Sequence, residues 1–142
     1  MRLTRPDGYQ LDTDPGRLDV PRLHEWLSTD AYWALGRTLE AVERSVAHSM
    51  NYGLYDPDGR QVGFARIVSD RAVFAYLCDV YVEPAARGGG LGTWFVTAVC
   101  DHARADGIRR LLLATKDAHG LYAKLGFTPL ADPSIWMEIQ PA

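Results

Sequence analysis

Four glycines within five positions, Gly88-Gly89-Gly90-Leu91-Gly92, constrain the fold of this chain more than any other feature. An apolar segment ends just before them at Val82, and an apolar segment with helical periodicity begins at Leu91. Glycine has no Cβ and reaches positive φ without steric cost, so successive backbone N–H groups can converge on one ligand. A helix that begins there adds unpaired amides and the positive end of its dipole. The sequence therefore predicts a site for phosphate or pyrophosphate.

Two common nucleotide-binding loops do not fit this stretch. A Walker loop needs Lys followed by Ser or Thr after the glycines, to contact the phosphates and magnesium, and that pair is missing here. The dinucleotide fingerprint needs a third glycine where Thr93 or Phe95 stands. The loop therefore favours neither an ATPase or GTPase nor a dinucleotide-dependent enzyme.

The stretch Arg87-Gly88-Gly89-Gly90-Leu91-Gly92 resembles the Arg/Gln-x-x-Gly-x-Gly/Ala loop of the GCN5-related N-acetyltransferases, the GNAT family. Downstream, Leu121-Tyr122-Ala123-Lys124-Leu125-Gly126-Phe127 resembles the second motif of that family. The two motifs occur in order, with a helix and a strand between them, and the resemblance covers residues 72–127. The first half of the chain resembles the family only in its general layout.

This resemblance implies acetyl-CoA as the cosubstrate. In the family, two parallel strands splay apart where the glycine loop begins, and the pantetheine arm lies in the wedge. By position, the backbone groups of Val80 and Val82 would pair with the pantetheine. The backbone amides that would hold the pyrophosphate belong to Arg87, Gly88, Gly90, Gly92 and Thr93. The alternative is a tight turn without a ligand, which needs one or two glycines rather than four.

Tyr122, in the second motif, is the residue that we predict to assist the chemistry. Direct attack of an amine on a thioester forms a tetrahedral oxyanion and expels a thiolate, to which a nearby phenol can donate a proton or a hydrogen bond. The tyrosine of the family's motif is similarly placed. The alternative is a tyrosine that packs on its helix with its hydroxyl group at the surface.

Asp79 is the carboxylate best placed to act as a general base, because an amine bound as ammonium must lose a proton before it attacks. It interrupts the apolar run from Phe74 to Val82, where a charge is costly unless it is paired or takes part in chemistry. The second interpretation is a structural acceptor for neighbouring donors, and a chain of water molecules is an alternative base.

Three further charged or titratable residues lie near the motifs. His119 stands three residues before Tyr122, on the same side of a short helix. It could orient the substrate, relay a proton, or make a local hydrogen bond. We expect Glu83 and Lys124 to be solvated charges without a catalytic role.

The cysteines and histidines do not have the spacing of a metal site, and we expect no metal. Cys78 and Cys100 lie in apolar segments, where we expect buried free thiols rather than a disulfide or a nucleophile.

Helix and strand signals alternate along the chain without repeats. Periodicity and turn residues predict strands at 9–13, 51–55, 61–69, 72–82, 111–115 and 135–140, and helices at 20–27, 39–48, 91–105 and 119–125. A right-handed crossover would make the strands on either side of the third helix parallel. We therefore expect an α/β (α+β) sandwich in a single domain over 1–142. Its mixed, mostly antiparallel central sheet would have helices on both faces and, from the resemblance, a splayed parallel strand pair.

The composition of the chain limits the kinds of partner that it is expected to bind. A formal net charge of -3 with scattered arginines gives no electrostatic footprint for nucleic acid. The sequence has no run of transmembrane length and no apolar signal-peptide core, so we expect a cytoplasmic protein without a membrane partner. Dimers are common in the GNAT family, which makes a homodimer a further expectation.

Three classes of function remain open. The first is an N-acetyltransferase that acts on a primary amine of a small or amino-acid-like acceptor. The second is a non-catalytic acyl-CoA sensor, which would have no use for Tyr122 or Asp79, and the third is an interaction domain with an incidental loop. The acceptor pocket could draw on an aromatic set, most of which we expect to be core: Trp26, Tyr32, Trp33, Tyr52, Phe74 and Tyr76.

Overall fold

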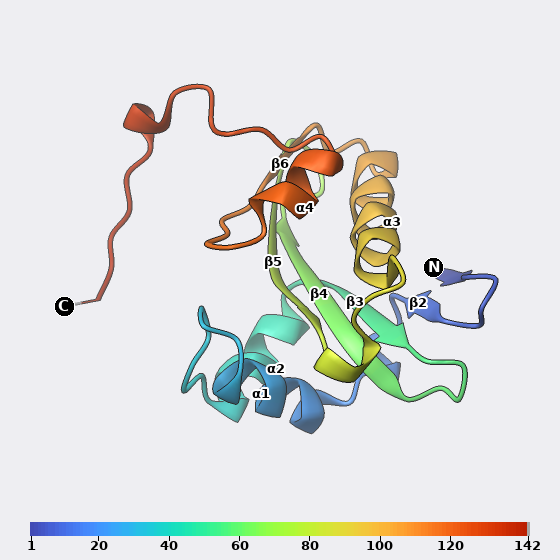
Figure 1. The fold of residues 1–142 in the computed structure, drawn as a ribbon. Helices are drawn as coiled ribbons and strands as arrows, with labels where there is room; N and C mark the ends of the chain where they lie inside the picture. Colours follow the sequence, from blue (N-terminus) through green and yellow to red (C-terminus); the bar gives the residue numbers. More distant parts are fainter. Residues whose placement is uncertain (142) are drawn as a thin grey trace.

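The computed structural model describes residues 1–141, and within them six strands form one mixed sheet (Figure 1). Neighbouring strands are antiparallel except the last two, which are parallel. The mixed, mostly antiparallel sheet with a parallel pair is therefore confirmed. In spatial and chain order the strands are β1 (Arg2–Thr4), β2 (Gln10–Asp12), β3 (Met50–Tyr55), β4 (Gln61–Ser69), β5 (Phe74–Val82) and β6 (Arg110–Leu112).

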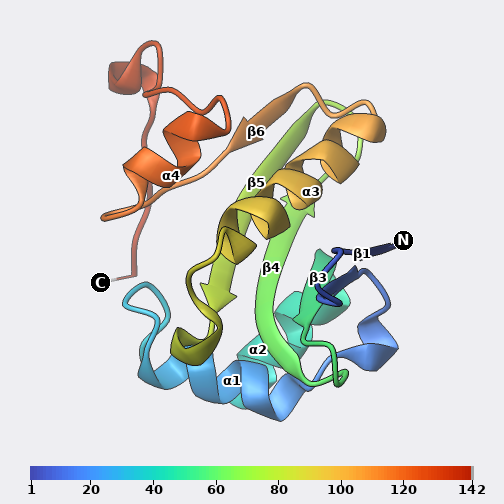
Figure 2. The ribbon, with the colours of Figure 1, turned by 45° about the vertical axis from the view of Figure 1, so that its right-hand side comes forward.

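Helices cover both faces of this sheet (Figure 2). Helix α1 (Val20–Thr29) begins at Asp19, whose side chain accepts a hydrogen bond from the amide of Arg22, and α2 (Leu39–Ala47) begins at Thr38 in the same way. Helix α3 (Leu91–Ala105) begins at Gly90 without a side-chain cap, and α4 (His119–Lys124) follows β6. Short 3-10 turns lie at η1 (Pro15–Arg17), η2 (Pro84–Ala86) and η3 (Pro133–Ile135).

The residues described here pack into two hydrophobic clusters on opposite faces of the sheet. One cluster joins the sheet to α3 through side chains such as Phe95 and Val99, which are fully buried. The other joins it to α1 and α2, where Leu23 and Val42 are fully buried against Phe64 of β4. Each buried aliphatic or aromatic side chain of this kind contributes about 1.5–3 kcal/mol to folding.

A β-bulge interrupts the pairing of β4 with β5. The register shifts so that Ala65 faces both Asp79 and Val80, and Asp79 takes a φ of 52°, a left-handed value that non-glycine residues rarely adopt. The extra residue reverses the side-chain alternation. Leu77 and Val80 therefore both pack toward α3, although their odd spacing would place them on opposite faces of a regular strand.

At the ends of the chain, one strand was missed and one expectation was wrong. Strand β1 was not predicted, and it pairs with β2 as an exposed hairpin. The strand predicted at 135–140 is missing from the described residues, where Pro133–Ile135 forms a 3-10 turn and irregular chain follows. The apolar residues there are suited to a strand, but that segment pairs with no strand of residues 1–141.

Candidate active site

The site begins where β5 and β6 separate. Their parallel ladder joins Phe74 with Arg110, Ala75 with Leu111 and Tyr76 with Leu112, and it ends there. β5 continues to Val82 while the chain after Leu112 turns away, which explains why β6 is shorter than the predicted strand at 111–115. The backbone of β5 beyond Tyr76 therefore borders a wedge.

The glycine loop lies beyond the C-terminal end of β5. Gly88, Gly89 and Gly90 have φ values of 100°, 62° and 75°, all in the region that glycine adopts without strain. Within residues 1–141, the amides that donate to no protein acceptor include those of Gly88, Gly89, Gly90, Gly92 and Thr93. These donors surround the positive end of the α3 dipole, so the arrangement suits a pyrophosphate.

Arg87 differs from its predicted role. Its backbone amide donates to the carbonyl oxygen of Pro84 at 3.2 Å and is thus used within the turn that precedes the loop. Its side-chain Nε donates to the carbonyl oxygen of Val82 at 2.8 Å. Arg87 therefore connects the end of β5 to the loop. Val80 lines the wedge, and its pairing with the pantetheine stays a prediction.

Arg5, which sequence reasoning did not single out, supports the glycine loop from outside. Its Nη2 donates to the carbonyl oxygen of Gly89 at 2.6 Å, across 84 residues of sequence. This bond restrains the peptide group between Gly89 and Gly90, whose N–H is one of the available amides. Because the partner is a distant backbone atom, no local pattern in the sequence indicates the contact.

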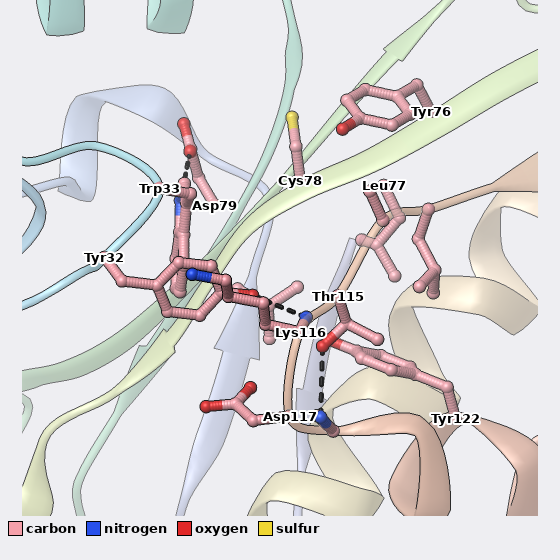
Figure 3. Close-up of a pocket in the computed structure, with 14 residues that line it drawn as sticks. Tyr32, Trp33, Tyr76, Leu77, Cys78, Asp79, Thr115, Lys116, Asp117 and Tyr122 are labelled. Atoms are coloured by element: carbon pink, nitrogen blue, oxygen red, sulfur yellow. Dashed lines mark hydrogen bonds between the residues drawn. The ribbon is translucent and has the colours of Figure 1, made fainter.

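An open cleft of about 420 Å³ occupies the wedge (Figure 3). Residues from β5, from the loop between α1 and α2, from the chain after β6 and from α4 line it, with Tyr32, Trp33 and Tyr76 as its aromatic part. Of the other aromatic candidates, Trp26 and Tyr52 are core residues.

Tyr122 projects from α4 toward Thr115 in the cleft (Figure 3). Its side chain is nearly buried, and this burial raises the pKa of the phenol to about 12. The hydroxyl group therefore stays protonated at neutral pH. In that state Tyr122 can donate a hydrogen bond to a developing negative charge.

Asp79 is buried, and three donors hold its carboxylate. Trp33 Nε1 donates to Oδ1 at 3.0 Å, while Arg37 Nη1 and Arg66 Nε donate to Oδ2 at 2.7 and 2.9 Å. The carboxylate thus ties the loop between α1 and α2 to the sheet. Protonation of Asp79 would remove a buried charge that pairs with two guanidinium groups, so this geometry favours the structural interpretation over the general base.

Asp117 is a second carboxylate that lines the cleft. It is exposed, and within residues 1–141 it takes part in no ion pair. Beside it, the amide of Lys116 donates to the hydroxyl group of Tyr32 at 2.8 Å, which joins the two sides of the cleft. Tyr32 and Trp33 pack edge to face with ring centroids 5.0 Å apart. The sequence offered no signal that would have selected Asp117.

The other titratable candidates occupy different surroundings. His119 is exposed and lines a neighbouring groove instead of the cleft. Glu83 was expected to be solvated, which was wrong: it is 8% exposed and pairs with Arg22 at 2.6 Å and with Arg60 at 3.3 Å. Lys124 is exposed, as predicted.

Both cysteines are free thiols, as predicted. Cys100 is buried and Cys78 is half-buried at the cleft, and this burial raises the pKa of each thiol to about 11. A thiol that remains protonated at neutral pH is a poor nucleophile.

Residues 1–141 contain no cluster of three or more His, Cys, Asp and Glu side chains able to hold a metal ion. None of the helices formed by these residues is both long enough and apolar enough to cross a membrane.

The chain matches the model of the acetyltransferase (GNAT) family over residues 20–127. It is 31% identical over 140 residues to a protein of Gibberella zeae named as a candidate acetyltransferase, covering 85% of this chain and 78% of that protein.

Comparison with solved structures leads to the same family. The fold matches the crystal structure of a candidate GNAT acetyltransferase from Xanthomonas campestris pv. campestris, with a TM-score of 0.88, 46% identity, and coverage of 94% of this chain and 93% of that one. It also matches N-acetylglutamate synthase from Neisseria gonorrhoeae in complex with coenzyme A and N-acetyl-glutamate, with a TM-score of 0.67, 22% identity, and coverage of 82% and 27%. On this evidence the chain belongs to the GNAT family of acetyltransferases.

Proposed function

We propose that this enzyme transfers the acetyl group of acetyl-CoA to the primary amine of a small cationic acceptor by direct attack. The observation that carries the proposal is that a glycine-rich amide cradle, an open strand wedge and a protonated tyrosine lie along one path. The coenzyme A complex of N-acetylglutamate synthase, which has the same fold, supports a coenzyme A ligand for this path.

The cosubstrate would bind along β5. Its pyrophosphate would accept hydrogen bonds from the amides of Gly88, Gly90, Gly92 and Thr93 at the positive end of α3. Its pantetheine arm would run beside Val80 along the part of β5 that lies beyond Tyr76 and lacks a β6 partner. The thioester would then reach the cleft, because the same segment of β5 lines it.

The acceptor would enter beside the loop between α1 and α2. Asp117 provides a negative charge for an ammonium group, and the rings of Tyr32 and Trp33 provide apolar contact. The ammonium group of Lys116 lies 5.5 Å from the centre of the Tyr32 ring, which shows that this ring accepts a cation. The cleft of about 420 Å³ suits a small molecule better than a protein segment or a polycation. We therefore propose a small primary amine, which is bound as ammonium.

In the reaction, the ammonium group first loses a proton to water, and the amine nitrogen attacks the thioester carbon. The tetrahedral intermediate collapses with cleavage of the C–S bond, and the nitrogen loses its second proton. The pKa of Tyr122, about 12, lies well above the ~8.5 of a free thiol, so full transfer of the phenol proton to the thiolate is unfavourable. Tyr122 would therefore stabilise the departing sulfur through a hydrogen bond, while the proton lost by nitrogen finally neutralises it.

Thermal unfolding with and without acetyl-CoA tests the binding step, because a ligand that binds only the folded state raises the midpoint. We expect stabilisation by acetyl-CoA and by CoA, and none by ATP or NAD. A panel of small amines, followed by release of free thiol, then tests transfer. Stabilisation without thiol release from any amine would favour the acyl-CoA sensor, and a shift only with ATP or NAD would contradict the proposal.

A further inference from the structure

Lys116 brings a primary amine of the chain itself into the cleft. Its ammonium group lies 5.5 Å from the centre of the Tyr32 ring, and its side chain extends across that ring in Figure 3. Among the described residues that line the cleft, Lys116 alone carries a primary amine. The cleft therefore already holds the functional group that we propose this enzyme to acetylate.

The backbone at Lys116 is held in place, whereas its side chain is free to move. The amide of Lys116 donates to the hydroxyl group of Tyr32 at 2.8 Å, and the amide of Ala118 donates to Oγ1 of Thr115 at 3.1 Å. Lys116 is exposed, and within residues 1–141 its ammonium group takes part in no ion pair. A flexible four-carbon stem on a fixed backbone can place its nitrogen at different points of the cleft.

Lys116 is also adjacent to the residue that Tyr122 faces. Tyr122 projects from α4 toward Thr115, which directly precedes Lys116, and both side chains line the cleft (Figure 3). A thioester assisted by Tyr122 would thus share a cavity of about 420 Å³ with the Lys116 amine. An amine tethered in so small a space has a high effective concentration at the thioester.

We propose that, when no acceptor is bound, the enzyme transfers the acetyl group of acetyl-CoA to Nζ of its own Lys116. This inference rests on the proposed acetyl transfer at this site. The ammonium group first loses a proton to water, and Nζ forms a bond with the thioester carbon. The C–S bond then breaks, the thiolate takes up the second proton lost by nitrogen, and acetyl-lysine and free CoA result.

Acetylation would change the charge that an acceptor meets in the cleft. Lys116 and Asp117 are neighbours in sequence, both exposed and of opposite charge. Acetyl-lysine is neutral, so the modification removes a positive charge that repels an ammonium group near Tyr32, and the negative charge of Asp117 remains. The modified enzyme should therefore bind a cationic amine more tightly.

Mass spectrometry of the intact protein and of its peptides tests the reaction, and the chain offers a matched control. Its two lysines are Lys116 and Lys124, and Lys124 is exposed on α4 but does not line the cleft. After incubation of the purified protein with acetyl-CoA and no amine, we expect one added acetyl group, at Lys116, and one equivalent of released thiol. The intact mass before acetyl-CoA is added sets the starting level.

Variants of the two lysines assign the modified position. Lys124→Arg should behave as wild type, whereas Lys116→Arg keeps the charge and should gain no acetyl group. Equal acetylation of both lysines in the wild-type protein would indicate chemical modification by acetyl-CoA outside the cleft and would overturn the proposal.

Kinetics separate acetylation within one molecule from acetylation between molecules. Within one cleft the rate constant should not depend on protein concentration, and Tyr122→Phe should lower it about 100-fold, because the leaving group loses its assistance. Stabilisation by acetyl-CoA is the check that this variant is folded. A rate constant proportional to protein concentration, or a Tyr122→Phe variant as fast as the wild type, would overturn the proposal.

The neutral variant Lys116→Gln stands in for acetyl-lysine and tests the effect on acceptor binding. Its KM for a cationic amine should be about 5-fold lower than that of Lys116→Arg, which keeps the positive charge. Equal KM values in the two variants would contradict this effect of the charge.

A panel of small amines in the same preparations distinguishes failure of this inference from failure of the proposed function. If a small amine is acetylated and Lys116 never is, self-acetylation is excluded and the proposed function stands. If acetyl-CoA stabilises the protein but neither a small amine nor Lys116 gains an acetyl group, both proposals fail.

Discussion

The Arg5 guanidinium holds the carbonyl oxygen of Gly89 at 2.6 Å, so the N-terminal hairpin restrains the loop that we assign to the pyrophosphate. The contact fixes one peptide of a loop whose three consecutive glycines would otherwise have wide conformational freedom. Loop order in the free enzyme lowers the entropy cost of binding the cosubstrate.

Arg5→Ala should therefore weaken acetyl-CoA binding without changing the chemistry. We expect KM for acetyl-CoA to rise about 5-fold, corresponding to the ~1 kcal/mol of one hydrogen bond, with kcat nearly unchanged. Steady-state kinetics with varied acetyl-CoA measures this. Arg2→Ala is the control, because Arg2 lies on the same hairpin and pairs with Asp12 instead. Equal effects of both variants would show that the hairpin as a whole, rather than this contact, is responsible.

Tyr122→Phe should lower turnover by roughly 100-fold, since general acid or hydrogen-bond assistance to a leaving group is worth about 10²–10⁴. KM for acetyl-CoA should change less than 2-fold, because the ring and its packing against Phe127 remain. Tyr55→Phe is the matched control for loss of a buried phenol outside the cleft. Unchanged turnover in Tyr122→Phe would remove this residue from the mechanism.

Asp117→Asn should separate acceptor binding from cosubstrate binding. Loss of the charge that faces the ammonium group should raise KM for the amine about 10-fold and leave KM for acetyl-CoA unaffected. Initial rates at several concentrations of each substrate test this. Asp58→Asn removes an exposed carboxylate from the β3–β4 turn and should behave as wild type. If KM for the amine does not change, Asp117 does not bind the acceptor.

Asp79→Asn should reduce stability and preserve the shape of the pH–rate profile. Removing one partner of a buried ion pair costs about 3 kcal/mol of unfolding free energy, here because Arg37 and Arg66 lose their counter-ion. Urea denaturation and a pH–rate profile measure the two effects. Glu83→Gln is the control, as a second buried carboxylate paired with arginines away from the cleft, and its stability loss should be similar. Loss of the acidic limb in Asp79→Asn alone would reinstate Asp79 as the base.

Stability should fall as the solution becomes strongly alkaline. Burial raises the pKa of Tyr55 and of Tyr122 from 10 to about 12, and burial with a hydrogen bond to Asp30 does the same for Tyr81. Because the folded-state pKa values exceed the unfolded ones, the protonated phenols contribute stability that is complete below pH 10 and lost between about pH 10 and pH 12. Denaturation over this range, with tyrosinate absorbance as the second signal, measures it. Full ionisation of all tyrosines in the folded protein at pH 11 would contradict the expectation.

Local sequence patterns predicted the elements that frame the site. The helix over 91–105 was correct at both ends, because Gly90 precedes and Gly107 follows the segment with helical apolar periodicity. The strand at 61–69 was equally clear, between a Pro-Asp-Gly turn and Asp70. Such signals lie within a few residues of the element that they define.

Local sequence patterns could not predict the contacts that organise the site. Asp79 is held by Trp33 and Arg37, which are separated from it by 46 and 42 residues, and no periodicity relates these positions. The unusual feature visible in sequence was a charge in an apolar run, and it indicated a paired or catalytic residue without identifying the partners. The predicted strand at 135–140 failed for a related reason, because a strand also needs a neighbour, which residues 1–141 do not provide.

The bulge at Asp79 makes the length of β5 as important as its composition. A regular strand of the same length would exchange the faces of Val80 and Tyr81, so that a tyrosine now bonded to Asp30 would point toward α3. Deleting Asp79 would keep both faces but would remove the carboxylate that holds the loop between α1 and α2. A single substitution on β5 affects only one face of the strand, either the face toward α3 or the face toward α1 and the loop between α1 and α2. Loss of the bulge at constant length would alter both faces together, so relatives that keep this arrangement should vary in the side chains of β5 while they retain the bulge and its extra residue together.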